Sequence, residues 1–302
     1  MQLGQYPPAD HVLAHISDTH FLAGRRPLYG SIDTDANLRR ALEALEASEL
    51  RPDALVFTGD IADLGESDAY DRVREIVQPA AQRMGSELVW VMGNHDNRAA
   101  FRTGLLGSSG ASSDSEAEAP IDRVIDLAGL RLIALDTSVP GYHHGELAAE
   151  QLDWLREQLS TPAPHGTLLA LHHPPVPSPV AYMQVLELQE QHALADVVRG
   201  SDVRGILGGH LHYSTHSLFA GIPVAVAAAT CYTMDVAAPE STLVGRDGGQ
   251  SISLVHVYAD QVVHSIVPLG DFPVVASFGT DFTTRLEAAS AVELREYYAK
   301  QQ

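Results

Sequence analysis

Short apolar runs alternate along the chain with longer segments in which apolar residues recur every three or four positions. The runs are continuously apolar, which is typical of strands that are covered on both faces of a sheet. They occupy residues 11–17, 54–58, 87–92, 167–171 and 203–207. Because amphipathic segments separate several of them, the pattern predicts parallel strands joined by crossover helices.

The amphipathic segments predict the helices that cover these strands. In residues 34–48, the leucines Leu38, Leu42 and Leu45 fall on one face of a helix. Similar patterns predict four more helices, at residues 68–84, 146–159, 185–199 and 288–299. A strand pair is expected around Gly129, from residues 124–126 and 130–135.

The apolar pattern between residues 214 and 267 predicts antiparallel strands. They are expected at residues 214–219, 224–229, 251–258 and 261–267. Two βαβ-like halves followed by this β-rich section indicate an α/β fold, a four-layer α/β/β/α sandwich of two mixed sheets flanked by helices. Residues 1–270 are expected to form a single domain, and residues 271–302 a helical C-terminal extension. Polar, glycine-containing stretches at 107–120 and 245–250 predict surface loops.

Composition limits the classes of partner. The chain has 302 residues, of which 45% are hydrophobic and 19% charged, and these are globular values. Nineteen basic against 39 acidic residues give a net charge of 19 − 39 = −20. A net charge this negative argues against binding to nucleic acids and to anionic membranes. It also repels phosphate, unless positive charge is concentrated at one place.

Cysteine usage and the N-terminus indicate where the protein acts. Cys231 is the only cysteine, so no disulfide can form within the chain. The first ten residues lack the basic and apolar regions of a signal peptide, and no apolar run approaches the length of a membrane span. We therefore expect a cytoplasmic protein with no integral membrane segment.

Polar residues that can bind metal follow five of the predicted strands. The five clusters are Asp18-x-His20, Gly59-Asp60, Gly93-Asn94-His95, His172-His173 and Gly209-His210-x-His212. A single Asp or His at a strand end is usually a turn or capping residue. Five such clusters in order are hard to produce by chance, and ligands of α/β sheets gather at the carboxyl ends of strands. The set therefore predicts one site.

The residue types indicate a two-metal centre. Imidazole and carboxylate ligands without a thiolate favour Mn, Fe, Zn or Co over a cysteine-bound structural zinc. A carboxylate can bridge two ions, and such a pair can activate a hydroxide for in-line attack on phosphorus. The ions also supply the local positive charge that the acidic surface lacks.

In these five blocks the sequence resembles the calcineurin-like metallophosphoesterase superfamily, over residues 11–270. Within it the resemblance is greatest to bacterial class III cyclic nucleotide phosphodiesterases. The stretches that carry this resemblance are HISDTH at 15–20, WVMGNHD at 90–96, DTSVPGYHHGE at 136–146, LHHPP at 171–175 and GGHLHY at 208–213.

The resemblance implies a role for each matching residue. Asp18, His20 and His212 would hold the first metal, and Asp60 would bridge to the second. The ligands of the second metal would be Asn94, His172 and His210. His95 would face the phosphate and protonate the leaving ribose oxygen, and Asp63 would orient His95. The substrate would contact Asn94, His95 and one of His143 and His144, of which we favour His143.

The implied activity is hydrolysis of cyclic nucleotides. A hydroxide shared by the two ions would open 3′,5′-cyclic AMP to AMP, and 2′,3′-cyclic nucleotides are further substrates of such enzymes. The cofactors would be two divalent or trivalent ions, foremost manganese and iron, with zinc and cobalt as alternatives. The resemblance also allows a homodimer.

Two other interpretations stay open. The same chemistry could act on another diester, such as a glycerophosphodiester or a lipid-linked pyrophosphate. Alternatively, the chain could be a non-catalytic metal-binding scaffold. Leu64 stands where protein serine/threonine phosphatases have an arginine, and Asp63 where purple acid phosphatases have a tyrosine ligand, so the sequence departs from both subfamilies.

Several other residues have more than one interpretation. His173 is expected to shape the turn before Pro174 rather than to bind metal. Cys231 suits inert packing or the edge of the metal site, and Tyr232 suits packing or stacking on a nucleobase. Arg25 and Arg26 are expected in a solvated loop, with contact to phosphate as the alternative.

Overall fold

The computed structural model describes residues 3–107 and 118–300. Contacts divide the chain into two units. The larger unit runs from Asp10 to Gly270, and the residues before and after it form the smaller one. Most of the surface loop predicted at 107–120 lies outside the described residues.

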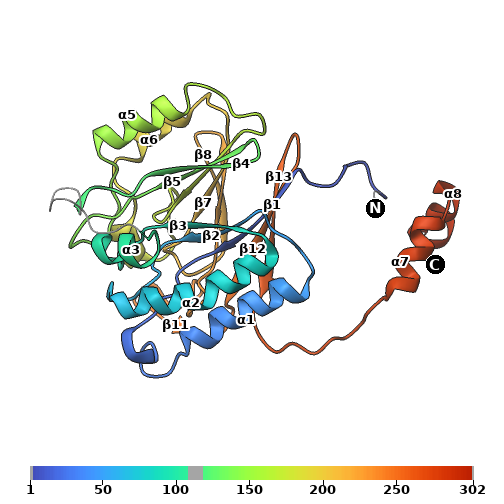
Figure 1. Ribbon diagram of the computed structural model, residues 1–302, viewed down its shortest axis with the longest axis horizontal. Helices are drawn as coiled ribbons and strands as arrows, with labels where there is room; N and C mark the ends of the chain where they lie inside the picture. The colour runs from blue at the N-terminus through green and yellow to red at the C-terminus, as the bar shows by residue number, and fades with distance from the viewer. Residues whose placement is uncertain (1–2, 108–117, 301–302) are drawn as a thin grey trace. The chain divides into compact units, whose positions relative to one another are not determined.

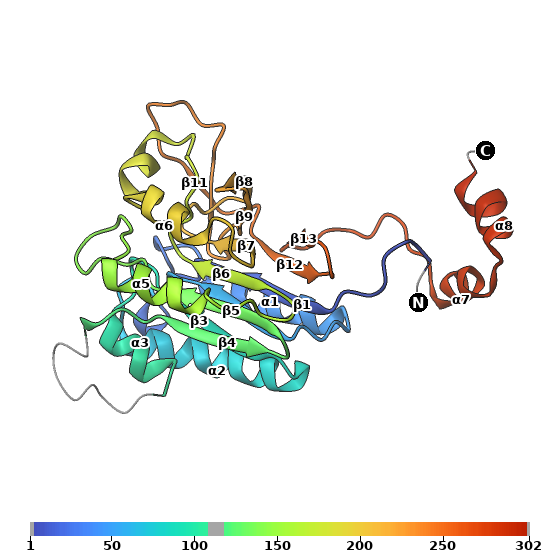
Figure 2. The ribbon, with the colours of Figure 1, turned by 90° about the horizontal axis from the view of Figure 1, so that it is seen from above.

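The first sheet of the larger unit has the strand order β13-β12-β1-β2-β3. Its strands are β1 (His11–Ile16), β2 (Ala54–Thr58), β3 (Glu87–Val91), β12 (Ser251–Val257) and β13 (Val262–Pro268). The first three are parallel, whereas β12 runs antiparallel to both β1 and β13. Figure 2 shows β12 and β13 side by side at the edge of this mixed sheet.

The second sheet has the order β4-β5-β6-β7-β9-β8. Its strands are β4 (Arg123–Leu127), β5 (Leu130–Leu135), β6 (Thr167–Leu171), β7 (Val203–Gly208), β8 (Thr215–Phe219) and β9 (Ile222–Val226). The pairs β4–β5 and β8–β9 are antiparallel, and the neighbours between them are parallel. Two short strands, β10 (Thr233–Met234) and β11 (Gly245–Arg246), pair separately.

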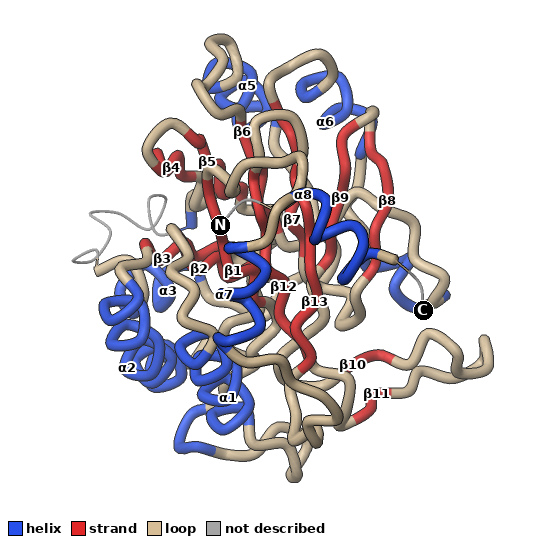
Figure 3. Tube along the Cα trace, turned by 90° about the vertical axis from the view of Figure 1, so that its right-hand side faces the viewer, coloured by secondary structure: helices blue, strands red, loops and turns tan. Residues whose placement is uncertain are grey.

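Helices cover the outer faces of the two sheets, which pack against each other. Buried side chains such as Leu13, Val56, Leu132 and Leu207 form the core between the sheets. The helices α1 (Thr34–Ala47), α2 (Ser67–Met84) and α3 (Arg98–Gly104) lie on the first sheet, and α5 (Ala149–Gln158) and α6 (Gln191–Val198) on the second. Figures 1 and 3 show the strands between these two groups of helices. The predicted four-layer α/β/β/α sandwich is confirmed.

One predicted helix is wrong in its first part. The sequence pattern predicts a helix over 185–199, but a short 3-10 helix, η2 (Ala181–Leu186), ends there and α6 begins only at Gln191. The segment between them is extended, because Gly145 N donates to Glu187 O at 3.2 Å and Gln189 N donates to Gly145 O at 2.7 Å. A long-range contact therefore overrides the local pattern.

The smaller unit contains α7 (Thr280–Ala288), α8 (Ala291–Glu293) and the turn of π-helix η3 (Leu294–Ala299). The single helix predicted at 288–299 is interrupted, because Ser290 caps a new helix: its Oγ accepts from Glu293 N at 3.3 Å. No helix of the described residues is long and apolar enough to cross a membrane.

Candidate metal centre and active site

The candidate ligands lie in loops that follow the parallel strands of both sheets. Asp18 and His20 follow β1, Asp60 follows β2, and Asn94 follows β3. From the second sheet, His172 follows β6, and His210 and His212 follow β7. The structure brings all of them together at the carboxyl ends of these strands, where α/β proteins bind their ligands.

The backbone is unusual at most of these positions. Five of the seven candidate ligands have a left-handed backbone conformation, with φ between 47° and 69°. They are Asp18, His20, Asp60, His210 and His212. Non-glycine residues rarely adopt this conformation, which costs about 1 kcal/mol or more each and concentrates at functional sites. The fold therefore holds these side chains in place at a cost in stability.

Two glycines let these loops approach one another. A Cβ at Gly93 would overlap the Asp60 carboxylate and backbone nitrogen. A Cβ at Gly209 would overlap Ser17 Oγ and lie 2.6 Å from Thr58 O. The glycines of the Gly-Asn-His and Gly-His-x-His motifs are therefore required because there is no room for a side chain beside the candidate ligands.

Asp60 lies at the middle of the cluster. Its Oδ2 is 3.4 Å from His20 Nε2 and 3.3 Å from His172 Nε2, so one carboxylate oxygen faces ligands from both sheets. Its Oδ1 accepts a hydrogen bond from the backbone nitrogen of His95 at 2.9 Å. This geometry suits a residue shared by two cations.

Asp18, His20 and His212 form one side of the cluster. Asp18 Oδ1 lies 3.3 Å from His212 Nε2 and 3.9 Å from His20 Nε2, and the two imidazole nitrogens are 3.2 Å apart. With Asp60, these residues offer ligand atoms that all lie within 4.8 Å of one another. Two carboxylates and two imidazoles, all buried, form a donor set that fits a transition metal.

Asn94, His172 and His210 form the other side. His172 Nε2 lies 3.0 Å from Asn94 Oδ1, and the rings of His172 and His210 are 5.0 Å apart. His173 belongs to the same group of histidines. However, its Nδ1 lies 2.8 Å from Thr137 Oγ1 and its Nε2 lies 3.1 Å from His143 O, so both of its ring nitrogens contact protein oxygens.

Each candidate histidine ligand directs one nitrogen to a protein oxygen. His20 Nδ1 contacts Asp63 Oδ1 at 2.9 Å, and the other three contact backbone carbonyls. These carbonyls are Thr58 O for His172, Leu186 O for His210 and Tyr232 O for His212. Such a contact fixes the tautomer and the ring orientation of a metal ligand. By donor type, burial and these outer contacts, the residues fit a metal centre.

The charge pairing of Asp60 with His172 shifts the pKa of both side chains. Burial raises the pKa of Asp60, but the imidazoles of His172, His95 and His20 outweigh it and hold that pKa well below its usual range. Burial lowers the pKa of His172, and the carboxylate of Asp60 outweighs it and raises that pKa to about 9. The carboxylates are therefore anionic and ready to bind cations.

His95 faces the same cluster from the side of the solvent. Its ring contacts those of His20 and His143, with centroids 4.8 and 5.0 Å apart, and its side chain is 31% exposed. His95 Nδ1 donates to the backbone carbonyl of Asp63 at 2.8 Å. The Asp63 carboxylate Oδ1 lies 2.9 Å from His20 Nδ1 and 3.7 Å from His95 Nδ1, so the hydrogen bond from His95 to Asp63 is made to the main-chain carbonyl.

The two histidines of the 136–146 loop, His143 and His144, have different surroundings in the structure. His143 Nδ1 lies 2.9 Å from Asn94 Nδ2 and lines the cavity above the cluster. His144 Nε2 lies 2.9 Å from Glu146 Oε1 instead. The favoured choice, His143, is therefore the one that the fold places beside the candidate ligands.

Sequence reasoning did not select Asp96, which ties two of the loops together. Its carboxylate accepts from the backbone nitrogens of Ile61, Ala62 and Gly93 and from the hydroxyl of Tyr70. Burial and the nearby Asp60 raise the pKa of Asp96 to about 6. Its place directly after Gly93-Asn94-His95 was the available signal.

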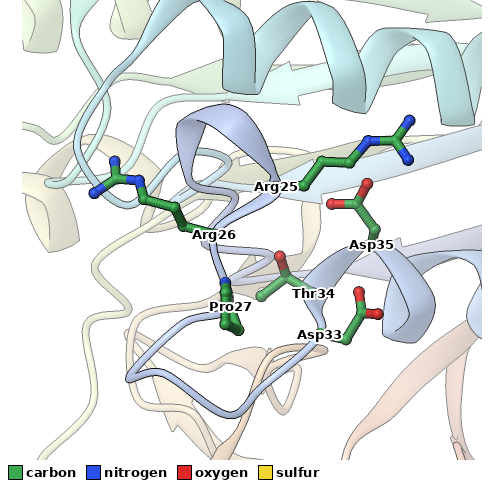
Figure 4. A pocket seen from close by; sticks show the side chains of 6 residues that line it. All are labelled: Arg25, Arg26, Pro27, Asp33, Thr34 and Asp35. Carbon is green, nitrogen blue, oxygen red and sulfur yellow. The ribbon is translucent and has the colours of Figure 1, made fainter.

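Arg25 and Arg26 lie away from the cluster. They line a separate cavity with Asp33, Thr34 and Asp35 at the start of α1, and Figure 4 shows the two arginines pointing in opposite directions. Arg26 pairs with Glu66 at 2.7 Å. The structure therefore favours the solvated loop over a contact with phosphate.

A model of the family described as "Calcineurin-like phosphoesterase" matches residues 11–214, which include every candidate ligand. The chain belongs to this family. The smaller unit of the chain lies outside the matched residues.

Two curated proteins are similar along most of the chain. The chain is 53% identical to the "cAMP/cGMP dual specificity phosphodiesterase MT0825" of Mycobacterium tuberculosis, over 96% of the chain and 90% of that protein. It is 52% identical to a "Probable cyclic nucleotide phosphodiesterase" of Rhodococcus erythropolis, over 88% and 86%.

A solved structure supports the fold. A dimetal phosphatase from Danio rerio superposes with a TM-score of 0.62 at 17% identity, and the match covers 86% of this chain and 96% of that one. At this identity the likeness concerns the fold alone.

Proposed function

We propose that this phosphoesterase hydrolyses cyclic nucleotides, opening 3′,5′-cyclic AMP to AMP and also acting on 2′,3′-cyclic nucleotides. The observation that supports the chemistry is a cavity of about 310 Å³ that is lined by His95 and by five of the seven candidate metal ligands. The other two, Asp18 and His172, are fully buried. The substrate class is supported by two relatives, 53% and 52% identical to this chain, that are named as cyclic nucleotide phosphodiesterases.

We assign the metal ligands as the resemblance to the family implies. Asp18, His20 and His212 would hold one ion, Asp60 would be shared, and the second ion would be held by Asn94, His172 and His210. When bound, the ions would supply positive charge for the phosphoryl oxygens and lower the pKa of an attacking water. Imidazole and carboxylate donors suit manganese and iron, with zinc and cobalt as alternatives.

His95 acts as the general acid in this proposal. The Asp63 carbonyl can only accept, so His95 Nδ1 carries a proton and Nε2 carries another in the imidazolium form. Nε2 can give that proton to the leaving ribose oxygen and return to a neutral imidazole whose tautomer the Asp63 carbonyl fixes. General acid catalysis of this kind typically contributes about 10²–10⁴-fold to the rate.

Asn94 and His143 bind the phosphate. The Asn94 amide nitrogen donates to His143 Nδ1, so the proton of neutral His143 lies on Nε2. That N–H group can donate to a phosphoryl oxygen, and it adds one of the few donors that an acidic protein offers to an anion.

A substrate panel tests the proposal. The metal-loaded protein is given 3′,5′-cyclic AMP, 3′,5′-cyclic GMP, 2′,3′-cyclic AMP and glycerophosphocholine at equal concentrations. We expect turnover of the cyclic nucleotides. Turnover of the glycerophosphodiester alone would favour the rival diester, and no turnover at full metal content would favour the non-catalytic scaffold.

The predicted cytoplasmic location and homodimer stay predictions. Fractionation of the cells that make the protein tests the first, and light scattering of the purified chain measures the mass that decides the second.

A further inference from the structure

A second cavity opens beside the catalytic one, with the aromatic rings of Tyr29 and Tyr232 between the two. We call it the annex; its volume is about 390 Å³, and its walls include Tyr29, Tyr232, Met234, Leu243, Arg246 and Asp247. The first four of these residues also line the catalytic cavity. The two cavities therefore adjoin along these four side chains, and the annex lies next to the space above the metal ligands.

A continuous line of rings leads from the metal ligands to the annex. The ring centroids of His20 and His212 are 5.0 Å apart, those of His212 and Tyr232 are 4.5 Å apart, and those of Tyr232 and Tyr29 are 5.5 Å apart. The two tyrosines meet at an interplanar angle of 69°. Since they brace each other edge to face, they form a corner rather than one flat wall.

Tyr29 is held in this corner against its conformational preference. It lies in a tight turn in which Leu28 and Ile32 exchange backbone hydrogen bonds, and its φ is 50°. A left-handed backbone is a genuine outlier for an aromatic residue and is kept where the surroundings enforce it. The side chain is nevertheless 75% exposed, so its own burial does not explain the conformation.

The second tyrosine is seated by a glycine. Gly245 on β11 lies against the ring of Tyr232, where a Cβ would come within 2.9 Å of the Tyr232 ring carbon Cδ2. β11 pairs with β10, and the ion pair of Arg246 with Asp235 at 2.6 Å joins the two strands further. The wall of the annex is therefore a braced ribbon that positions the ring.

The chemistry of the annex suits a flat, uncharged heterocycle. Two aromatic rings and the apolar side chains of Met234 and Leu243 offer surface for stacking. Ser31 and Asp247 add a hydroxyl and a carboxylate to the lining, and these can hydrogen-bond the edge of a base. Arg246 also lines the annex, but its positive charge is already paired with Asp235. The annex therefore attracts a further anion only weakly.

We propose that the annex binds the nucleobase of the substrate, with Tyr29 and Tyr232 as the stacking residues that determine the preference for nucleotides. This inference rests on the proposed function. A glycerophosphodiester has no ring to place there, so the annex would distinguish the two classes of diester by binding energy.

The test compares substrates with and without a base. The metal-loaded enzyme is assayed with 3′,5′-cyclic AMP and with the base-free cyclic ribose 3′,5′-phosphate, and the two values of kcat/KM give a preference ratio. In Tyr29→Ala we expect the ratio to fall by about ten-fold, since one aromatic stacking partner is typically worth that order in nucleobase binding. Tyr29→Phe keeps the ring and should keep the ratio.

Gly245→Ala provides an independent variant. It adds a methyl group against the Tyr232 ring without removing any aromatic group, and we expect it to lower the same ratio through KM for cyclic AMP. An unchanged ratio in both Tyr29→Ala and Gly245→Ala would overturn the annex proposal while cyclic AMP is still hydrolysed. A wild-type enzyme that turns over other diesters and no cyclic nucleotide would instead overturn the proposed function, and the annex proposal with it.

Discussion

At the scale of the residue, five of the candidate metal ligands are held in a left-handed backbone conformation. Asp18, Asp60 and His212 were selected because they follow apolar strands, and the structure places them in one cluster. Their left-handed backbone could not be predicted, because it depends on contacts between loops that are distant in sequence. For the same reason the main-chain contact of Asp63 with His95 has no signature in the sequence.

The role of His95 leads to the first prediction. His95→Ala should lower kcat by about 10²–10⁴-fold, the usual contribution of general acid catalysis, while both metals remain bound. Steady-state kinetics and elemental analysis of the same preparation measure the two quantities.

His144→Ala is the matched control for His95→Ala. His144 lies against Glu146 rather than against the candidate ligands, so its removal should leave kcat within about two-fold. Equal turnover by His95→Ala and the wild-type enzyme would remove His95 from the reaction.

The close approach at Gly93 gives the second prediction. In Gly93→Ala the new methyl group overlaps Asp60, so the loop must shift. We expect a loss of about 1–3 kcal/mol in the free energy of unfolding and a reduced metal content. Denaturant titration and elemental analysis measure the two effects.

Gly248→Ala controls for the general effect of adding a methyl group, because a Cβ there meets nothing within 4 Å. It should keep both the stability and the metal content. Wild-type stability and full metal content in Gly93→Ala would show that the ligand loops tolerate a wider separation than the structure indicates.

At the scale of the element, long apolar runs were predicted well, and segments fixed by tertiary contacts were not. The runs at 54–58 and 167–171 are β2 and β6, because a strand between two layers must be apolar on both faces. The segment at 187–189 has helical spacing but pairs with Gly145 from another loop. Local spacing carries no information on such a partner.

The junction of β4, β5 and α5 contains a carboxylate whose charge is unfavourable. Asp122 accepts hydrogen bonds from Asp136 N and Gln151 Nε2, yet burial raises its pKa to about 6. Because the pKa is higher in the folded than in the unfolded chain, the native state gains stability when the group is protonated. This contribution is present below about pH 4 and is lost as pH rises to about 6.

Asp122→Asn tests this linkage. We subtract the free energy of unfolding of the variant from that of the wild type. This difference should fall by about 1–3 kcal/mol between pH 4 and pH 7, because the folded wild type loses the Asp122 proton in this range and the asparagine of the variant does not titrate. Urea titrations of both proteins across this range measure the difference. A difference that stays constant with pH would contradict the raised pKa.

At the scale of the whole molecule, the candidate metal ligands and His95 all lie in the larger unit. The order of apolar runs and amphipathic segments predicted the four-layer fold, but the sequence carried little information on residues 271–302. In the structure several apolar side chains there are strongly exposed, including Val274 at 82% and Val275 at 96%. A segment without a buried core gives no periodic pattern to interpret.

Removal of residues 271–302 is therefore expected to leave the reaction intact. A chain that ends at Gly270 keeps every candidate ligand and both tyrosines of the annex. We expect kcat/KM for cyclic AMP within about two-fold of the full-length value, since changes outside buried or ligand-contacting positions usually have small effects. A large loss of activity in a truncated protein with native far-UV circular dichroism would assign the extension a part in catalysis.

The division of the ligands between two sheets has a consequence for protein synthesis. A ribosome that has completed β4 and β5 has already released Asp18, His20, Asp60 and Asn94 into the nascent chain. The remaining three candidate ligands are made only after residue 171, so the unfinished polypeptide contains only four of the seven residues proposed to bind the metal ions. If the proposed ligands are correct, the complete metal centre can form only after residue 212 has been made.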